Sequence, residues 1–187
     1  MPLKSKMLVI TKQGSVKKSN INNQKAAKMR RQRGYHWEDT IVKRFNGTPK
    51  WRAFRLGSPS IALPDVLAVN NENEELFTIE AKSGTSTSLP VPADQIERCL
   101  DWIETFGVYK KRNVLLAFKF LSKKRLGIGK YENRELREFF KIWDTSLGIT
   151  DCVCTYDGKI FAKSNGEKKE LFLKECLMPF KTKQRQI

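Results

Sequence analysis

The strongest constraint on how this chain folds is a pair of short apolar runs around a polar loop, in residues 63–84 (LPDVLAVNNENEELFTIEAKSG). Both runs are rich in strand-forming residues and the loop is rich in Asn and Glu, so the segment predicts a β-hairpin. Asp65, Glu80 and Lys82 lie in or beside these strands, although strands disfavour all three residue types. Their position therefore calls for an explanation other than strand propensity.

The expected pairing of this hairpin brings the three polar residues together. If residues 64–69 and 76–82 pair antiparallel and symmetrically about the loop, Asp65 lies opposite Glu80 on one side of the sheet. Glu80 and Lys82 are two residues apart and share that side. Two opposed carboxylates repel each other unless a cation or a shared proton relieves them. The opposite, core-facing side is expected to carry Phe77, Ile79 and Ala81.

A third carboxylate is expected from the helix predicted over residues 35–46 (YHWEDTIVKRFN). A step of three residues back from the first member of its apolar stripe reaches Glu38, and burying a carboxylate there is costly without compensation. Each acid alone is more often exposed or ion-paired, and Glu80 with Lys82 could form a simple ion pair on a solvated strand. Convergence of all three acids favours a functional site. The apolar stripe consists of Ile41, Val42 and Phe45.

Converging carboxylates without histidine favour a hard cation, Mg²⁺ or Mn²⁺, bound through oxygen. The chain has a single His, and its four Cys match neither a disulfide scaffold nor paired zinc spacing, which favours reduced, buried thiols. A neighbouring Lys can orient the attacking water or offset charge that develops on phosphate. The pattern therefore predicts metal-assisted hydrolysis of a phosphodiester.

The charge of the chain is +16, from 36 basic and 20 acidic residues, and it is unevenly distributed. Residues 1–37 contain ten Lys and Arg and no acid, residues 38–121 contain eleven of each sign, and residues 122–187 contain fifteen basic and nine acidic residues. A near-neutral centre with basic flanks is typical of a polyanion binder. Charge alone fits an enzyme, an architectural DNA-binding protein or a ribosomal protein, but only an enzyme explains the converging acids.

The remaining pattern predicts an α/β fold with a mixed central sheet. No apolar run approaches the about 20 residues of a membrane span, and the four-residue run MLVI is too short for a signal peptide, so we expect an intracellular protein of the cytoplasm or nucleoid. The other expected elements are strands at 51–56 and 113–120, helices at 92–106, 132–143 and 167–178, and a hairpin at 152–162 that turns at Asp157-Gly158.

One family shares this arrangement of motifs. Pro64-Asp65, followed after fourteen residues by Glu80-Ala81-Lys82, is similar to the PD-(D/E)xK nuclease signature. Its surroundings are Gly34-x-x-x-Glu38, Arg55, the loop Gly57-Ser58-Pro59-Ser60 and, at the start of the next helix, Gln95. In this order and spacing, residues 30–121 resemble the archaeal Holliday junction resolvases, and the resemblance fades through residues 122–180.

The resemblance implies a single restriction-endonuclease-like domain, a mixed central β-sheet flanked by helices. It also implies a homodimer that nicks four-way DNA junctions with Mg²⁺, for which Mn²⁺ could substitute, and with no small-molecule cofactor. We expect residues 1–29 to form a flexible, disordered basic arm, residues 30–180 the nuclease domain with its catalytic core at 30–121, and residues 181–187 a basic tail.

Site residues carried over from the family match positions of this sequence. Glu38, Asp65, Glu80 and the main-chain carbonyl of Ala81 match the metal site, and Lys82 matches the catalytic lysine. Ser58 or Ser60 matches a loop serine near the scissile strand, and Gln95 matches a residue that buttresses the site, although a surface role on its helix fits it equally well. The predicted DNA-binding residues are Arg30, Arg31, Arg33, Arg55, Ser58 and Ser60.

Two alternatives stay open on the sequence. The first is another PD-(D/E)xK endonuclease, of a repair or restriction-like kind. The second is a DNA-binding protein that retains the fold without catalysis. The four intact polar residues Glu38, Asp65, Glu80 and Lys82 argue against the second, because a protein that only binds DNA needs no converging acids beside phosphate.

Overall fold

The computed structural model divides after Arg33 into two compact units, residues 1–33 and 34–187, which we describe separately. The residues that it describes are 10–56, 62–164 and 167–182. Within these ranges no helix is both long enough and apolar enough to cross a membrane.

Helix α1 (Ile10–Asn46) runs through the boundary between the two units. The helix predicted over 35–46 is confirmed as its C-terminal part, and Gly47 follows its last residue as expected. α1 thus starts well before the predicted helix. The division into an arm, a nuclease domain and a basic tail stays a prediction.

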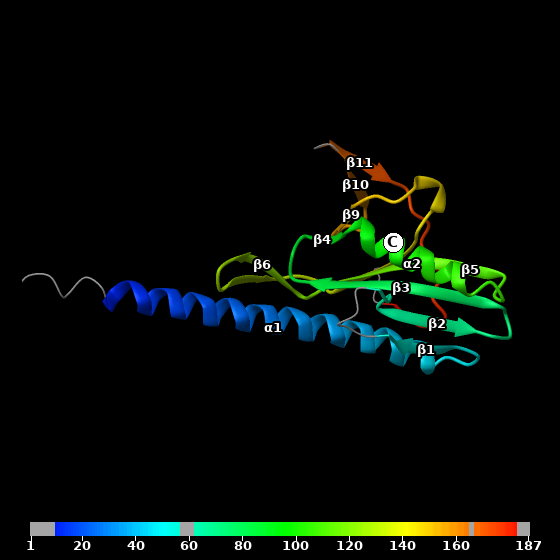
Figure 1. Cartoon of the computed structure of the whole chain (residues 1–187), viewed down its shortest axis with the longest axis horizontal. Coiled ribbons are helices and arrows are strands. Elements are labelled where there is room, and N and C mark those ends of the chain that lie inside the picture. Colours follow the sequence, from blue (N-terminus) through cyan, green and yellow to red (C-terminus); the bar gives the residue numbers. More distant parts are fainter. Residues whose placement is uncertain (1–9, 57–61, 165–166, 183–187) are drawn as a thin grey trace, which may run out of the picture. The chain divides into compact units, whose positions relative to one another are not determined.

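A mixed five-stranded sheet forms the centre of the unit 34–187 (Figure 1). Its strand order is β1-β2-β3-β5-β8, with β3 and β5 parallel and the other neighbours antiparallel. The mixed α/β sheet expected from the sequence is thereby confirmed. The strands are β1 (Arg52–Arg55), β2 (Val66–Asn70), β3 (Glu75–Gly84), β5 (Lys111–Phe120) and β8 (Arg137–Ile142).

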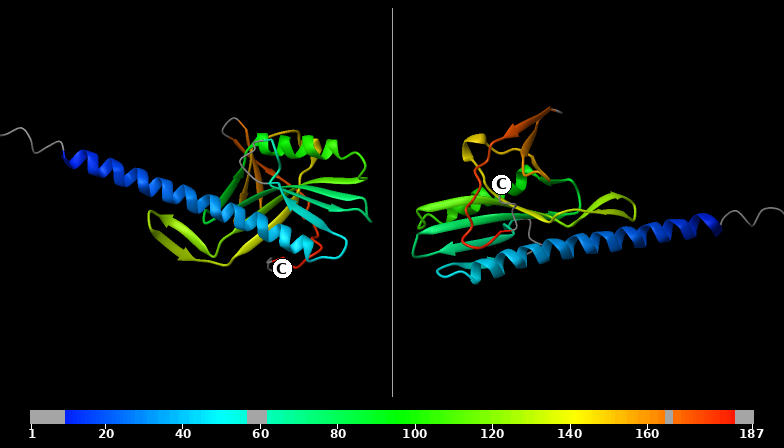
Figure 2. Two further views of the ribbon diagram at one scale, coloured as in Figure 1. Left: turned by 60° about the horizontal axis from the view of Figure 1, so that its bottom comes forward. Right: turned by 180° about the vertical axis from the view of Figure 1, so that it is seen from behind.

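Both faces of β3 are covered, which explains why its sequence is almost continuously apolar. On one face the last turns of α1 pack on the residues predicted to face the core, and Trp37, Ile41 and Phe45 are fully buried there. On the other face lies α2 (Ala93–Thr105), the helix predicted over 92–106. Figure 2 shows α2 and the C-terminal turns of α1 on opposite sides of the sheet. The core-facing residues of β3 on the α1 side are Phe77, Ile79 and Ala81.

A second, four-stranded sheet continues the core on the α2 side, in the order β11-β10-β9-β4. The predicted hairpin at 152–162 is confirmed there, and Gly158 in its turn has φ of 85°, a conformation that L side chains rarely adopt. The strands are β4 (Ser88–Val91), β9 (Cys152–Thr155), β10 (Ile160–Ser164) and β11 (Glu167–Leu171). A short 3₁₀ helix, η1 (Thr145–Leu147), precedes β9.

A separate two-stranded hairpin is formed by β6 (Lys123–Gly127) and β7 (Lys130–Asn133). In Figures 1 and 2 it projects from one end of the central sheet. It pairs with neither of the two larger sheets.

The helices predicted over 132–143 and 167–178 are wrong, because these segments form β7, β8 and β11. In β8, adjacent residues pack on opposite faces: Phe140 is buried against Trp37, and Phe139 is partly buried against Phe120. Burial on both faces produces apolar spacings of three and four residues that imitate a helical stripe. After β11 the pattern has period two, since Leu171 and Leu173 are buried and the residue between them is exposed.

Candidate active site

The predicted register of the β2–β3 hairpin is confirmed. Val69 pairs with Leu76 and Val66 pairs with Ile79, so the ladder, continued by one pair, sets Asp65 opposite Glu80. Asp65 directly precedes β2, and its Oδ2 accepts a hydrogen bond of 2.8 Å from the main-chain N–H of Ala81. This bond fixes the Asp65 carboxylate beside the segment of β3 that carries the other two predicted residues.

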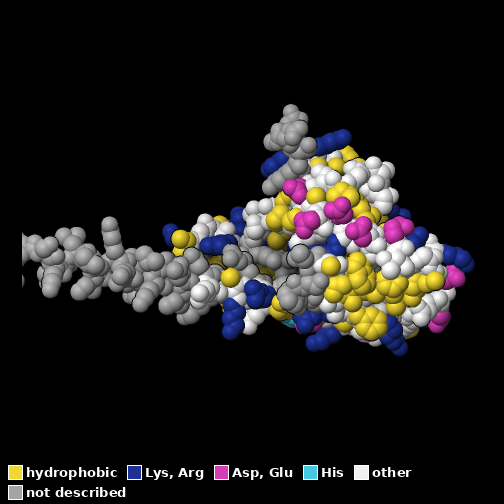
Figure 3. Space-filling view, in the orientation of Figure 1, with side chains coloured by type: hydrophobic (Ala, Val, Ile, Leu, Met, Phe, Trp, Pro, Cys, Tyr) yellow, Lys and Arg dark blue, Asp and Glu magenta, His cyan; other side chains and the backbone are white. Residues whose placement is uncertain are grey.

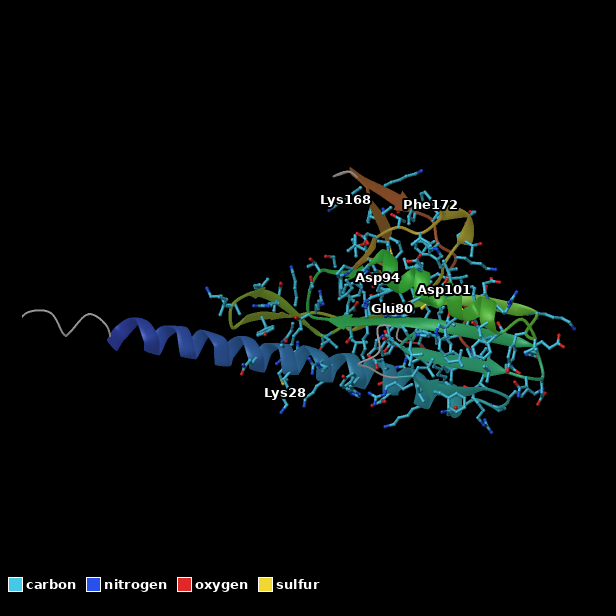
Figure 4. The ribbon with its side chains drawn as sticks, viewed as in Figure 1. Lys28, Glu80, Asp94, Asp101, Lys168 and Phe172 are labelled. Atoms are coloured by element: carbon cyan, nitrogen blue, oxygen red, sulfur yellow. The ribbon has the colours of Figure 1, made fainter. Side chains whose placement is uncertain are left out.

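Glu80 is 1% exposed and lies on the α2 side of β3, where Figure 4 labels it beneath the helix that carries Asp94 and Asp101. Its two oxygens have different cationic partners: Lys82 Nζ is 2.5 Å from Oε1, and the Arg98 guanidinium is 2.8 Å from Oε2. Burial raises the pKa of Glu80, while Lys82 lowers it. Asp65 raises it further and Arg98 opposes that increase. The side chain is therefore a buried acid that is held by two cations and repelled by a neighbouring carboxylate.

Glu38 points inward from α1, as predicted, and is buried. Burial, followed by the negative charge of Asp65, raises its pKa from 4.5 to about 7. Arg55 on β1 opposes this shift, with its guanidinium 4.0 Å from Glu38 Oε2. The Arg55 guanidinium also lies 3.4 Å from Asp39 Oδ1 and 5.0 Å from the centre of the Tyr35 ring. Glu80 contributes to the raised pKa of Glu38 as well, so the three predicted acids act on one another.

The structure describes only part of the remaining predicted set. Gln95 lies on α2 with its Oε1 buried, and this atom has no hydrogen-bond partner among the described residues. Arg31 is exposed and Arg33 is partly exposed on the first unit. The predicted loop serines Ser58 and Ser60 and the side chain of Arg30 lie outside the described residues.

Sequence reasoning missed Arg98, whose side chain is mostly buried against Glu80. It lies one turn after Gln95 on α2, away from the apolar stripe that predicted the helix, so periodicity gave no reason to place it in the site. The available signal was indirect: a buried carboxylate that also faces other acids needs more positive charge than one Lys supplies.

The donor chemistry of the three acids fits a hard divalent cation, since every side chain offers carboxylate oxygen. Glu38 and Asp65 repel each other, as the raised pKa of Glu38 records, and a shared cation would relieve that repulsion. Within the described ranges, no group of three or more His, Cys, Asp or Glu is close enough together to hold a metal ion as it stands. Here both oxygens of Glu80 are engaged by Lys82 and Arg98.

Residues 29–147 match the sequence model of a family described as archaeal Holliday junction resolvase (Hjc). The match spans more than half of the chain and includes all three acids, Lys82 and Arg98. The chain belongs to this family. Membership confirms the resemblance seen in the sequence and extends it to residue 147.

One similar solved structure is that of Hjc from Archaeoglobus fulgidus, described as a Holliday junction resolvase from an archaeal hyperthermophile. The similarity has 19% sequence identity and a TM-score of 0.40, and covers 57% of this chain and 75% of that one. No curated protein matches the chain.

Family membership supports the fold class and the nuclease assignment predicted from the sequence. The mixed α/β fold is the restriction-endonuclease-like fold expected for such a chain, and the protein is a nuclease of the Holliday junction resolvase family. The substrate that this implies is branched DNA. Residues 148–187, which include β9, β10 and β11, lie outside the matched segment.

Proposed function

We propose that this protein resolves four-way DNA junctions as a homodimer, through paired, symmetric, divalent-metal-dependent nicks. The observation that supports the proposal is the mutual electrostatic influence of Glu38, Asp65 and Glu80, which come from α1, the start of β2 and β3. Such a concentration of negative charge beside a phosphate substrate is unfavourable unless a cation is part of the site.

In this proposal Glu38, Asp65, Glu80 and the Ala81 carbonyl would hold Mg²⁺, and Mn²⁺ would substitute. When bound, the cation would polarise the scissile phosphate and make water a stronger nucleophile. The hydrogen bond from the Ala81 N–H to Asp65 keeps one of these carboxylates beside β3 before the cation arrives. The site is therefore partly preorganised by the hairpin itself.

Lys82 is the group that would act directly on the substrate. Glu80 fixes its Nζ, yet the side chain is still partly exposed and can reach a phosphate at the surface. There it would offset negative charge on the phosphate as the bond to the leaving oxygen breaks, or orient the attacking water. Arg98 is more deeply buried and holds the second oxygen of Glu80. We assign it a positioning role.

Other predicted residues would hold the DNA. Arg55 is more exposed than Arg98, and its planar guanidinium suits two oxygens of one phosphate. Gln95 would buttress the site through its buried amide. The remaining proposed DNA contacts are Arg30, Arg31, Arg33, Ser58 and Ser60.

The homodimer follows from the symmetry of the substrate. A four-way junction has two-fold symmetry, and a C₂ dimer places two copies of one active site at symmetric positions. Figure 3 shows hydrophobic side chains gathered over β1 and β2, where Phe54 is exposed and Leu56 and Val69 are partly buried. An exposed apolar patch of this kind is suited to contact with a second copy.

The test uses purified protein with end-labelled four-way junction and linear duplex of the same sequence, each with and without Mg²⁺. We expect paired nicks at symmetric positions in the junction, none without metal, and almost no cleavage of the duplex, because only the branch presents backbone to both sites. Sedimentation should give a dimer. A monomer, or equal cleavage of duplex and junction, would leave only the general nuclease assignment. Binding without cleavage in Mg²⁺ and in Mn²⁺ would favour the non-catalytic alternative.

A further inference from the structure

The hairpin formed by β6 and β7, residues 123–133, is here called the wing. Its two strands pair only with each other, and none of its residues belongs to either buried cluster. A two-stranded hairpin without a packed face is marginally stable by itself. The wing therefore adds little to the stability of the core, and its presence points to a contact outside the chain.

The base of the wing is fixed to the end of the catalytic strand. The Leu121 N–H donates to the carbonyl of Gly84, the last residue of β3, at 2.9 Å, and the Arg125 N–H donates to the Thr85 carbonyl at 3.0 Å. The guanidinium of Arg134 donates to the Ser86 carbonyl at 2.9 Å. Since Gly84 is two residues beyond Lys82, the base of the wing lies on the order of 7 Å along the strand from that residue.

The wing carries positive charge that the described part of the chain does not neutralise. It has four basic residues and one acid, Glu132, and that acid pairs with Lys124 at 3.5 Å. Lys123, Arg125 and Lys130 have no carboxylate within ion-pair distance among the described residues. The register pairs Arg125 with Tyr131, so these two side chains share one face with Lys123. That face combines cations with an exposed aromatic ring.

The tip of the wing is apolar and exposed. Leu126 is 58% exposed and Ile128 is 94% exposed. Gly129 has φ of 72°, which lets the chain reverse directly after Ile128. The result is a narrow aliphatic point on a cationic stem. Proteins that bend or open DNA use such aliphatic side chains as wedges between bases whose stacking is broken.

We propose that the wing is a junction-binding element of the proposed resolvase: its cationic face binds backbone phosphates of one arm, and Leu126 and Ile128 insert at the unstacked bases of the crossover. The inference rests on the proposed function for the identity of the substrate. Because the base of the wing is bonded to the chain just beyond Lys82, at the end of β3, the wing would meet the same DNA that the acids would cut. Charge decides the occupant, because a second copy of this chain carries the same net +16 and the DNA backbone is negative.

The tip is tested by the double variant Leu126→Ser/Ile128→Ser in the full chain, with no divalent metal present. The probe is an immobile four-way junction with 2-aminopurine at the crossover, whose fluorescence rises when the base is unstacked. We expect about tenfold weaker junction binding and loss of the fluorescence rise, with duplex binding unchanged. Leu177→Ser, at a leucine that is 97% exposed outside the wing, is the matched control and should behave as wild type.

The stem is tested by Lys123→Gln/Lys130→Gln, compared with Lys168→Gln/Lys169→Gln on β11. Figure 4 labels Lys168 on that strand, away from the wing. The wing variant should lower the slope of log affinity against log salt by about two, for junction and duplex alike, and the β11 variant should not.

Two results would overturn the assignment of the tip. In the first, the tip variant binds the junction and unstacks its bases as the wild type does. In the second, the tip variant differs from the wild type only in its sedimentation coefficient. The second result would make the tip a protein interface. Cleavage of the junction by the wild-type protein is measured separately in Mg²⁺. If the wild-type protein cleaves the junction but the wing variants bind it normally, only the assignment of the wing is refuted. If the wing variants lose binding as expected but the wild-type protein does not cleave, only the proposed cleavage is refuted.

Discussion

Two glutamates are buried in the central sheet, Glu80 on β3 and Glu138 on β8, and their surroundings are similar at first sight. Glu80 is 1% exposed and Glu138 is 0% exposed. Each is held by an Arg from a helix and a Lys from the sheet: Arg98 and Lys82 for the first, Arg44 and Lys119 for the second.

The difference lies in what else surrounds each acid. Arg44 binds Glu138 through two nitrogens, at 2.7 and 3.0 Å, and its guanidinium also lies over the rings of Trp37 and Phe180. Glu138 and Arg44 thus form a two-pronged ion pair beside aromatic rings. Glu80 has its cations and also Asp65, whose charge raises its pKa. Burial and ion pairing are therefore common to both acids, and the charge of Asp65 on Glu80 is the feature that marks the candidate site.

The largest expected effects come from neutralising the acids, first Asp65 or Glu80 at the candidate site and then Glu138 at the second buried ion pair. Asp65→Asn and Glu80→Gln should reduce single-turnover junction cleavage by about 10³-fold or more, with junction binding intact or slightly tighter, because neutralising these acids removes repulsion of phosphate. Gel-based cleavage and fluorescence titration measure the two quantities. Cleavage by either variant at the wild-type rate in Mg²⁺ would remove that residue from the site.

Glu138→Gln is the matched variant at the other acid. It leaves Arg44 and Lys119 buried beside a neutral group, so the free energy of unfolding should fall by about 3 kcal/mol. The cleavage rate of the protein that remains folded should be unchanged. Urea denaturation and active-site titration separate the two effects, and a loss of rate without a loss of stability would mean that both glutamates serve the reaction.

A smaller effect is expected at the cations. Arg98 lowers the pKa of Glu80, so Arg98→Gln should move the acidic limb of the pH–rate profile to higher pH and slow cleavage about tenfold. Arg98→Lys should restore both in part. Arg44→Gln, which removes the corresponding cation from Glu138, should lower stability and leave the pH profile in place. An unshifted profile in Arg98→Gln would show that this Arg only helps to pack α2 against the sheet.

Protonation of Glu38 gives a pH-dependent effect on stability. The pKa of Glu38 is about 7 in the folded protein and about 4.5 when unfolded, so the folded state holds the proton over a range where the unfolded state has lost it. Stability should therefore fall as pH rises from about 4.5 to about 7, by about 1–2 kcal/mol, since the Glu38 side chain is still 10% exposed and solvent screens part of its charge. Glu38→Gln should remove this dependence. Urea denaturation at pH 5 and pH 7.5 measures it. An equal change in the free energy of unfolding between these two pH values in the wild type and in Glu38→Gln would contradict the assignment.

The outcome for Glu80 and Glu138 shows what sequence can predict here. The loop between β2 and β3 is short and polar, so symmetric pairing followed from the pattern, and with it the approach of Asp65 to Glu80. Glu38 was predictable because it breaks an apolar stripe. Arg98 was not, because docking of α2 on the sheet, and not the periodicity of the helix, directs it to Glu80.

Glu138 was missed for a related reason. Its strand has apolar residues on both faces, so Leu136, Phe139, Phe140 and Trp143 show the spacing of a helix, and the pattern predicts a helix there. Only pairing with β5 places the glutamate opposite Lys119 and within reach of Arg44. Local periodicity cannot register a partner that is 94 residues away along the chain.

The smallest effect on cleavage is expected from charge that lies outside both settings. Deleting residues 1–29 removes none of the acids or their cations, but it removes seven lysines. Junction binding should weaken, and the slope of log affinity against log salt should become shallower by up to about six, because fewer counterions are released. Saturated single-turnover cleavage should change much less. The lysines are Lys4, Lys6, Lys12, Lys17, Lys18, Lys25 and Lys28.

A full-length variant with all seven lysines changed to Gln is the control that separates charge from chain. If charge is the cause, this variant should reproduce the shallower salt slope of the deletion, because it removes the same positive groups and keeps the same length of polypeptide. A normal slope in the Gln variant and a reduced slope in the deletion would assign the effect to the chain itself. A normal slope in both would mean that residues 1–29 do not touch DNA, and the binding charge would then lie within residues 30–187, on surfaces such as the wing and Arg55.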